Sequence, residues 1–562
     1  MPPIARSFRA GPHGLTPCNF WPGESLLLLN PHLLLVRYSM DGRNPEVIES
    51  TPQEIGLEIA TLEERIRVLR SQLNARATVS RFPAEVLTEI FSWVQQFGGD
   101  ISSWSFNAST LVRWINVTHV SRNWRQIALC SRKLWSIIPV RSVRYAIEAM
   151  KRSGSAPLVI LTLMHIHKVA RDDEELWQLI LAASPRIRVL RLGGQSQLKD
   201  FNRPLPFLEN LHFQGGKEVP PALLSTSLKH LSLDSCSFDW DHLGLDKLTT
   251  LKITNPRRKV SFDAFILLLT SMPQLASLEV GSIFAEPDSQ AQNLTLCELI
   301  GSPLPVVTSD LPTLSFFKAH ISPSPAYIQL LARLRFEPKF VLVLAFKQQK
   351  YNDRDVILVL QILNRAVRNS SRKIRGIKCF SGGITAKRTV SFSFFANSRL
   401  GSPFMTFWVE LPMSNINYSR WLRELAPFPL DDVEVLSTDG INSKSGWTDN
   451  VFSGLSNLRR LQILAHGDVF LEYLIEDSRT AGLISFPALE ELEIHDLHFS
   501  TTFKSTMPYC LGRREARYAR LRELIFIGGK VTDAAVRKLE PRVDKVQRIS
   551  LEESRNQRRL RR

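Results

Sequence analysis

The chain has 562 residues, of which 44% are hydrophobic and 22% are charged. This composition is ordinary for a folded protein and excludes a mostly disordered chain. Lysine and arginine outnumber aspartate and glutamate by 71 to 54, and this net charge of +17 favours acidic partners without specifying a fold. Six scattered cysteines, none at CxxC spacing, argue against a disulfide-rich secreted scaffold and a zinc ribbon.

Residues 1–50 are rich in proline and have no sustained hydrophobic period, so we expect a disordered leader. The longest apolar stretch, 26–36, is interrupted by Asn30 and Pro31 and is too short to span a bilayer. No signal-peptide pattern is present near the start. These features predict an intracellular protein of the cytoplasm, the nucleus or both, with no membrane partner.

A heptad pattern follows over 54–78, and we expect a continuous helix from about 52 to 76. Its apolar positions are spaced 4, 3, 4, 3 and 4 residues apart, at Ile55, Ile59, Leu62, Ile66, Leu69 and Leu73. The seam covers only 19 residues, which is short for a coiled coil. We therefore favour a helix that packs on the next domain. The alternative is a short coiled coil that forms a weak homodimer through 55–73.

Residues 82–138 have the pattern of a compact helical domain. The first predicted helix follows Phe82 and Pro83, because proline suits a first helical turn, and carries Val86, Leu87, Ile90, Phe91 and Val94. After a polar insertion, a second predicted helix carries Leu111, Trp114, Val117, Val120, Trp124 and Ile127. Leu134 and Trp135 close the block.

From 157 to 547 a short LxxLxL pattern recurs, for example at Leu208, Leu211 and Phe213. It is typical of irregular leucine-rich repeats, in which stacked strands bury their leucines in one continuous core. The predicted fold is thus an α-helical N-terminal module followed by an α/β leucine-rich-repeat-like solenoid. Segments at 190–192, 211–213, 231–233, 251–253 and 278–280 should be parallel neighbours. We interpret 322–454 as degenerate repeats with insertions, and a separate inserted domain is the alternative.

In LxxLxL, the residue between the last two apolar positions points to the concave side of the repeats. These candidate substrate-binding residues are Arg191, His212, Ser232, Lys252, Glu279, Lys318, Gln462 and Glu493, followed by Ile525. The row is chemically mixed, whereas nucleic-acid binders show a basic stripe interleaved with aromatic residues. We therefore expect a protein partner. The arginine-rich residues 548–562 are predicted to be a solvated basic tail.

Sequence motifs of enzymes are missing. The chain has no GxSxG, HExxH, GxxxxGK[ST] or GxGxxG pattern. His165 and His167 could share one strand face, but no further ligands stand at suitable spacing. We therefore predict a protein without catalytic residues, metal or cofactor.

The helical block resembles an F-box. The resemblance rests on Phe82-Pro83, Glu85, Ile90-Phe91, the segment 120–125 (VSRNWR) and Leu134-Trp135. The segments 114–120 and 134–138 are similar to F-box proteins of mushroom-forming fungi, many of which have a preceding heptad helix and trailing leucine-rich repeats. Ser121 and Arg132 depart from the family pattern, which has cysteine and proline there.

The resemblance implies a non-catalytic substrate receptor of a Skp–cullin–F-box type ubiquitin ligase. The F-box would dock on a Skp-type adaptor and through it on a cullin–RING ligase, while the repeats would bind a protein substrate. The implied adaptor-binding residues are Phe82, Pro83, Val86, Leu87, Ile90, Phe91, Val120, Trp124 and Trp135. The alternative is a leucine-rich-repeat interaction scaffold that does not engage the ubiquitin machinery.

Overall fold

A computed structural model describes residues 51–96, 112–140, 142–162, 174–193, 204–215, 218–224, 227–240, 245–285, 314–321, 325–333, 340–347, 353–369, 373–382, 387–400, 402–412, 427–439, 455–464, 486–495, 501–516, 520–529 and 531–553. The predicted leader, the insertion at 97–111, and His165 and His167 lie outside these residues. The chain divides into two compact units, Met1–Leu87 with Asn116–Ile127, and Thr88–Ile115 with Ala128–Arg562.

The heptad segment forms helix α1 (Pro52–Arg76), as the spacing predicts. A capping box starts the helix: the Thr51 side chain accepts from the Glu54 backbone N–H, and the Glu54 carboxylate accepts from the Thr51 backbone N–H. The Glu54 carboxylate accepts from both the backbone N–H and the hydroxyl of Thr51, and these two hydrogen bonds hold the pKa of Glu54 below its usual value. No residue of α1 is buried by the described residues, so the packing of its seam on the next domain that we expected is not seen among them.

The block that resembles an F-box begins with helix α2 (Ala84–Gln96). The single second helix that we expected is instead two elements, the 3₁₀ helix η2 (Arg113–His119) and helix α4 (Arg122–Cys130). The break falls at Ser121, whose hydroxyl accepts from the Trp124 backbone N–H at 3.2 Å. Serine at this position caps a new helix N-terminus, because its side chain satisfies a backbone donor that has no partner within the helix.

Seventeen described strands form one sheet. They are β1 (Ile137–Pro139), β2 (Leu158–Leu161), β3 (Ile187–Gly193), β4 (Asn210–Gln214), β5 (His230–Asp234), β6 (Thr250–Thr254), β7 (Ser277–Gly281), β8 (Phe316–Ile321), β9 (Val341–Lys347), β10 (Gly376–Gly382), β11 (Lys387–Phe395), β12 (Met405–Pro412), β13 (Val435–Asp439), β14 (Arg460–Ile463), β15 (Glu491–His495), β16 (Leu521–Ile527) and β17 (Val543–Ile549). The helices between them are α5 (Val143–Ser153), α7 (Glu174–Ala182), α8 (Phe262–Thr270), α10 (Pro325–Arg333), α11 (Asp353–Asn369), α15 (Thr501–Glu515) and α16 (Asp533–Leu539).

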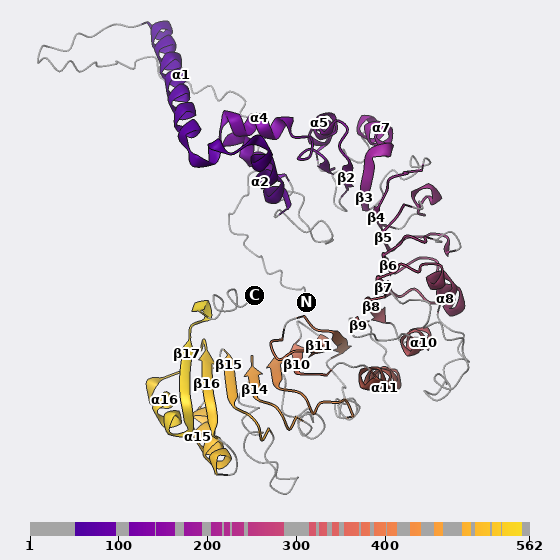
Figure 1. The fold of residues 1–562 in the computed structure, drawn as a ribbon, viewed down its shortest axis with the longest axis vertical. Coiled ribbons are helices and arrows are strands. Elements are labelled where there is room, and N and C mark those ends of the chain that lie inside the picture. The colour runs from indigo at the N-terminus through magenta and orange to yellow at the C-terminus, as the bar shows by residue number, and fades with distance from the viewer. Residues whose placement is uncertain are drawn as a thin grey trace, which may run out of the picture. The chain divides into compact units, whose positions relative to one another are not determined.

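The strands β3 to β7 are parallel neighbours in chain order, which confirms the prediction from the LxxLxL spacing. The repeated leucines fill the core: Leu211, Leu231, Leu251 and Leu278 pair in register and are at most 1% exposed. Helices α7, α8 and α10 lie on one side of strands β3 to β9 (Figure 1). The structure is therefore an α/β, leucine-rich-repeat-like array built on a mostly parallel sheet.

The region 322–454 continues the same sheet, so it does not form a separate inserted domain. Strand β9 pairs with β8 on one side and with β12 on the other, and β10 pairs with β13, all of them parallel. Between them, β11 pairs antiparallel with both β10 and β12. Among the described strands, β11 alone runs against the direction of the others. We call β10, β11 and β12 the reversed meander.

Two boundaries differ from our predictions. The sheet begins at β1, which pairs in parallel with β2, so the residues after Trp135 are already part of the sheet and not of a helical block. At the C-terminal end of the sheet, Arg548 lies in β17 and donates a hydrogen bond to the Asp533 carboxylate. The predicted start of the basic tail at residue 548 therefore falls inside the last strand. Among the described helices, none combines the length and the hydropathy needed to cross a membrane.

Candidate protein-interaction surfaces

Helix α2 exposes one apolar face. Its members, which we call the α2 stripe, are Val86, Ile90, Trp93 and Val94, and they are exposed by 43%, 36%, 55% and 43%. Steps of four, three and one residues place these side chains on one side of a helix. Large apolar side chains exposed side by side on a helix are typical of a surface that binds another protein.

The neighbouring face of α2 is core. Leu87 and Phe91 are fully buried, and the Gln95 side-chain amide donates to the Leu134 carbonyl at 3.0 Å. Our prediction that Leu87 and Phe91 belong to an adaptor-binding surface is therefore wrong. The buried and the exposed apolar residues lie side by side on one half of this helix, so the sequence period does not reveal which of them are covered.

Trp135 is also a core residue, 5% exposed, and does not line a surface. Its ring lies edge-on against Trp114, with centroids 5.1 Å apart, and its indole N–H donates to the Ala128 carbonyl at 2.9 Å. Tyr145 of α5 lies 6.0 Å from the same ring, and burial raises its phenol pKa to about 12. Trp135 thus connects the segment after α4 to the first helix of the sheet region.

The remaining predicted adaptor-binding residues lie outside α2. Phe82 and Pro83 precede the helix and are exposed, Val120 is 51% exposed, and Trp124 is half-buried. Trp93, the most exposed member of the α2 stripe, was not among the predicted residues. Its position three residues after Ile90 was the signal that could have revealed it.

The predicted concave positions lie in one continuous row across the sheet, which we call the central row. Strand register connects Arg191, His212, Ser232, Lys252, Glu279 and Lys318 from β3 to β8. It also connects Gln462, Glu493 and Ile525 from β14 to β16. The sequence pattern missed the residues that join these two groups through the reversed meander: Val343, Thr406, Ser393, Lys378 and Ser437.

Glu279 organises the charges in the first half of the row. Its Oε1 lies 3.0 Å from the Nζ atoms of both Lys252 and Lys318, and 3.3 Å from Nε2 of His320. Burial alone would raise the pKa of Glu279, but the contacts with His320 and the two lysines outweigh burial and lower this pKa to about 2. The carboxylate is therefore ionised at neutral pH and partly neutralises the two lysines.

His212 and Ser232 lie between Arg191 and Lys252 in the row. Burial, together with the nearby charges of Arg191 and Lys252, lowers the pKa of His212 to about 4. The imidazole is therefore neutral at pH 7. The Ser232 hydroxyl, on a residue 4% exposed, has no hydrogen-bond partner among the described residues.

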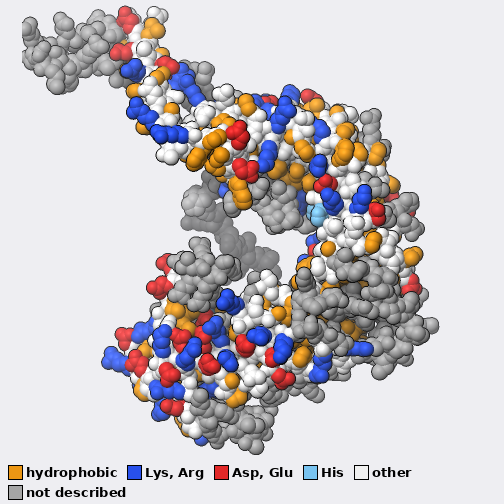
Figure 2. Space-filling view, viewed as in Figure 1, with side chains coloured by type: hydrophobic (Ala, Val, Ile, Leu, Met, Phe, Trp, Pro, Cys, Tyr) orange, Lys and Arg blue, Asp and Glu red, His pale blue; other side chains and the backbone are white. Residues whose placement is uncertain are grey.

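Glu493 is the acid in the second half of the row. Glu493 accepts from the Gln462 amide at 2.8 Å and lies 2.5 Å from Nε2 of His495. Arg460 pairs with Glu491 at 2.6 Å in the neighbouring register position. Basic and acidic side chains are interleaved over strands β14 to β17 (Figure 2). The chemistry of the sheet face is mixed and partly self-paired, unlike the basic, aromatic-rich face of a nucleic-acid binder.

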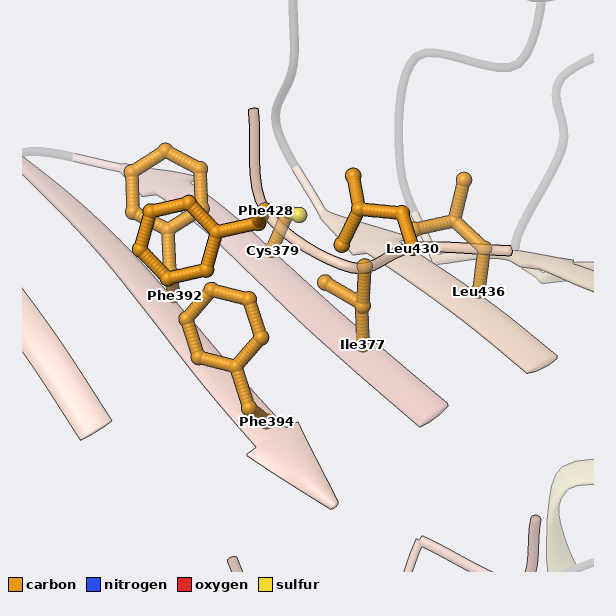
Figure 3. A pocket seen from close by; sticks show the side chains of 7 residues that line it. All are labelled: Ile377, Cys379, Phe392, Phe394, Phe428, Leu430 and Leu436. Carbon is orange, nitrogen blue, oxygen red and sulfur yellow. The ribbon is translucent and has the colours of Figure 1, made fainter. Parts of the chain in front are cut away.

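A small pocket lies beside the reversed meander, lined by Ile377, Cys379, Phe392, Phe394, Phe428, Leu430 and Leu436 (Figure 3). The rings of Phe394 and Phe428 are stacked, with centroids 5.6 Å apart, and burial raises the pKa of the Cys379 thiol. Because its lining is apolar and the thiol stays protonated, the pocket belongs to the core. The described residues also contain no cluster of side chains that could hold a metal ion.

Comparisons with known proteins add little to this description. No protein-family model matches the chain, and no curated protein matches it. Among solved structures, the crystal structure of a TLR13–ssRNA13 complex aligns with 16% sequence identity and a TM-score of 0.29, over 70% of this chain and 52% of that chain. The chain thus spans about half the length of that solved chain. A TM-score this low carries no argument, so the architecture rests on the strand pairings given above.

Proposed function

We propose that the protein is a non-catalytic substrate receptor of a Skp–cullin–F-box type ubiquitin ligase inside the cell. The observation that carries the proposal is the α2 stripe, which lies in the segment that resembles an F-box. A helix in water gains free energy when a partner covers such a face, at about 25 cal/mol per Å² of apolar surface buried. The stripe would bind a Skp-type adaptor and through it a cullin–RING ligase.

The more exposed side chains of the central row would bind the protein substrate, whereas Arg191, Ser232 and Glu493 are at most 8% exposed and would not contact it directly. The alternating cations, acids and neutral polar groups of the row suit recognition of a folded or extended polypeptide with complementary charges. The adaptor and the substrate would then bind different surfaces of the chain. The alternative function is a repeat scaffold that binds proteins through the sheet face and never engages the ubiquitin machinery.

The test is affinity purification of the full chain from its native cell, followed by detection of a Skp adaptor and a cullin. Ile90→Glu introduces a charge at an exposed position of the α2 stripe, and we expect both proteins to be lost from the purified complex. The matched control is Leu267→Glu on α8, because Leu267 is 73% exposed and far from the stripe in sequence. This control should retain both proteins.

Two results would contradict the proposal. If neither the adaptor nor the cullin is found with the wild-type chain, the scaffold function remains. If both proteins are found equally with wild type and Ile90→Glu, the ligase function stands but the α2 stripe is not the docking surface.

A further inference from the structure

The apolar seam of α1 is exposed along its length. Five of its six members are between 46% and 70% exposed, and these are Ile59, Leu62, Ile66, Leu69 and Leu73. The helix has 25 residues and none of them is buried. A row of isoleucines and leucines at heptad spacing is stable in water only when another helix covers it.

The seam reads the same in both directions, because its spacing of 4, 3, 4, 3 and 4 residues is symmetric about Glu64. Two copies of α1 that run antiparallel about Glu64 therefore align all six layers. Ile55 meets Leu73 of the second copy, Ile59 meets Leu69, and Leu62 meets Ile66. The aligned seam spans 19 residues without a mismatch.

The charges on α1 favour this orientation. Its acids all lie in the first half (Glu54, Glu58, Glu63 and Glu64) and its bases in the second half (Arg65, Arg67, Arg70 and Arg76). Figure 2 shows red side chains toward one end of this helix and blue ones toward the other. An antiparallel pair places each acidic half beside a basic half, which is favourable over a Debye length of about 8 Å.

A parallel pair of the same helices would be repulsive at its flanks. In that arrangement, the residues beside the seam would pair Glu58 with Glu63 of the second copy, and Arg65 with Arg70. Each pairing would occur twice, which gives four like-charge contacts. The antiparallel pair has only two like-charge contacts beside the seam: Glu63 meets Glu63 of the second copy, and Arg65 meets Arg65 of the second copy.

From the exposed symmetric seam and the divided charge, we propose that α1 binds α1 of a second copy of this chain as an antiparallel two-stranded coiled coil. The proposal is independent of adaptor binding, because it uses no residue of the α2 stripe. It makes the protein a dimer whose two chains are joined through this helix.

The oligomeric state of the full chain tests the proposal by sedimentation equilibrium, at protein concentrations up to about 100 μM. Wild type should approach twice the monomer mass. Leu62→Glu places a charge in the central layer and should weaken self-association at least about tenfold. Leu57→Glu is the matched control, because Leu57 is 71% exposed on the same helix but lies off the seam. It should associate like wild type.

The proposal is overturned if the wild-type chain stays monomeric. It is also overturned if Leu57→Glu weakens self-association as much as Leu62→Glu does. Cross-linking then tests the orientation. A mixture of Ile55→Cys and Leu73→Cys chains should form a disulfide between the two variants under mild oxidation, whereas Leu73→Cys alone should give no more dimer than wild type. Efficient cross-linking of Leu73→Cys with itself would show a parallel pair and overturn the antiparallel arrangement.

Discussion

Truncation of Trp135 should destabilise the protein severely, although the resemblance to an F-box places this residue among the adaptor-binding residues. Replacing a buried tryptophan with alanine costs about 3–5 kcal/mol. Trp135 lies in the upper part of this range for two reasons. Its edge-to-face contact with Trp114 is worth about 1 kcal/mol, and the Ala128 carbonyl loses a donor at a cost of about 1 kcal/mol or more. We therefore expect Trp135→Ala to lower the free energy of unfolding by about 4–5 kcal/mol.

Urea denaturation followed by far-UV circular dichroism measures this effect as a shift of the transition midpoint. Trp93→Ala is the matched control, because Trp93 is 55% exposed and its truncation should change stability by less than about 1 kcal/mol. Trp135→Phe keeps an aromatic ring but loses the N–H donor, so its midpoint should lie between those of wild type and Trp135→Ala. Equal midpoints for Trp135→Ala and Trp93→Ala would refute the core assignment of Trp135.

Three further changes have defined outcomes. Leu87→Ala should lower the free energy of unfolding by about 2–5 kcal/mol in urea denaturation, because the side chain is fully buried. An unchanged transition midpoint would show that Leu87 is a surface residue. The Glu279 pKa of about 2 lies below the usual value, so its ion pairs contribute stability that is present above about pH 4.5 and is lost as the pH falls toward 2. Thermal melts at pH 7 and pH 3 should therefore differ less in Glu279→Gln than in wild type, and an equal difference would contradict the ion-pair role. Arg514→Met should cost about 2–4 kcal/mol in urea, since the fully buried guanidinium donates to three backbone carbonyls between 486 and 489, and a loss below about 0.5 kcal/mol would contradict this role.

The repeats were predictable because one physical constraint determines both the pattern and the fold. Each strand must bury alternate residues, so Leu211 and Phe213 face the core and His212 faces the other side, and this alternation is visible in the sequence. The central row from Arg191 to Lys318 follows directly. The direction of β11 could not be predicted in this way, because buried and exposed residues alternate with the same period in parallel and antiparallel strands.

The helical block was harder to predict because the apolar half of α2 is only partly covered by the rest of the chain. Hydrophobic period alone does not separate Leu87, which faces the core, from Val86, which faces out. The neighbours that cover Leu87 come from other parts of the chain, and a sequence window does not contain them. Ser121 shows the same limit, because its role as a cap depends on a helix break that apolar spacing did not indicate.

We expect the reversed meander to influence how the sheet unfolds. In a stacked array, each strand is stabilised mainly by its two neighbours, so cooperativity passes from one interface to the next. Among the described strands, ladder pairing connects β1 to β9 with β13 to β17 through β12, β11 and β10, and the two antiparallel ladders join segments that are close in sequence. A destabilising change in β11 should therefore uncouple the two stacks, and one unfolding transition should become two.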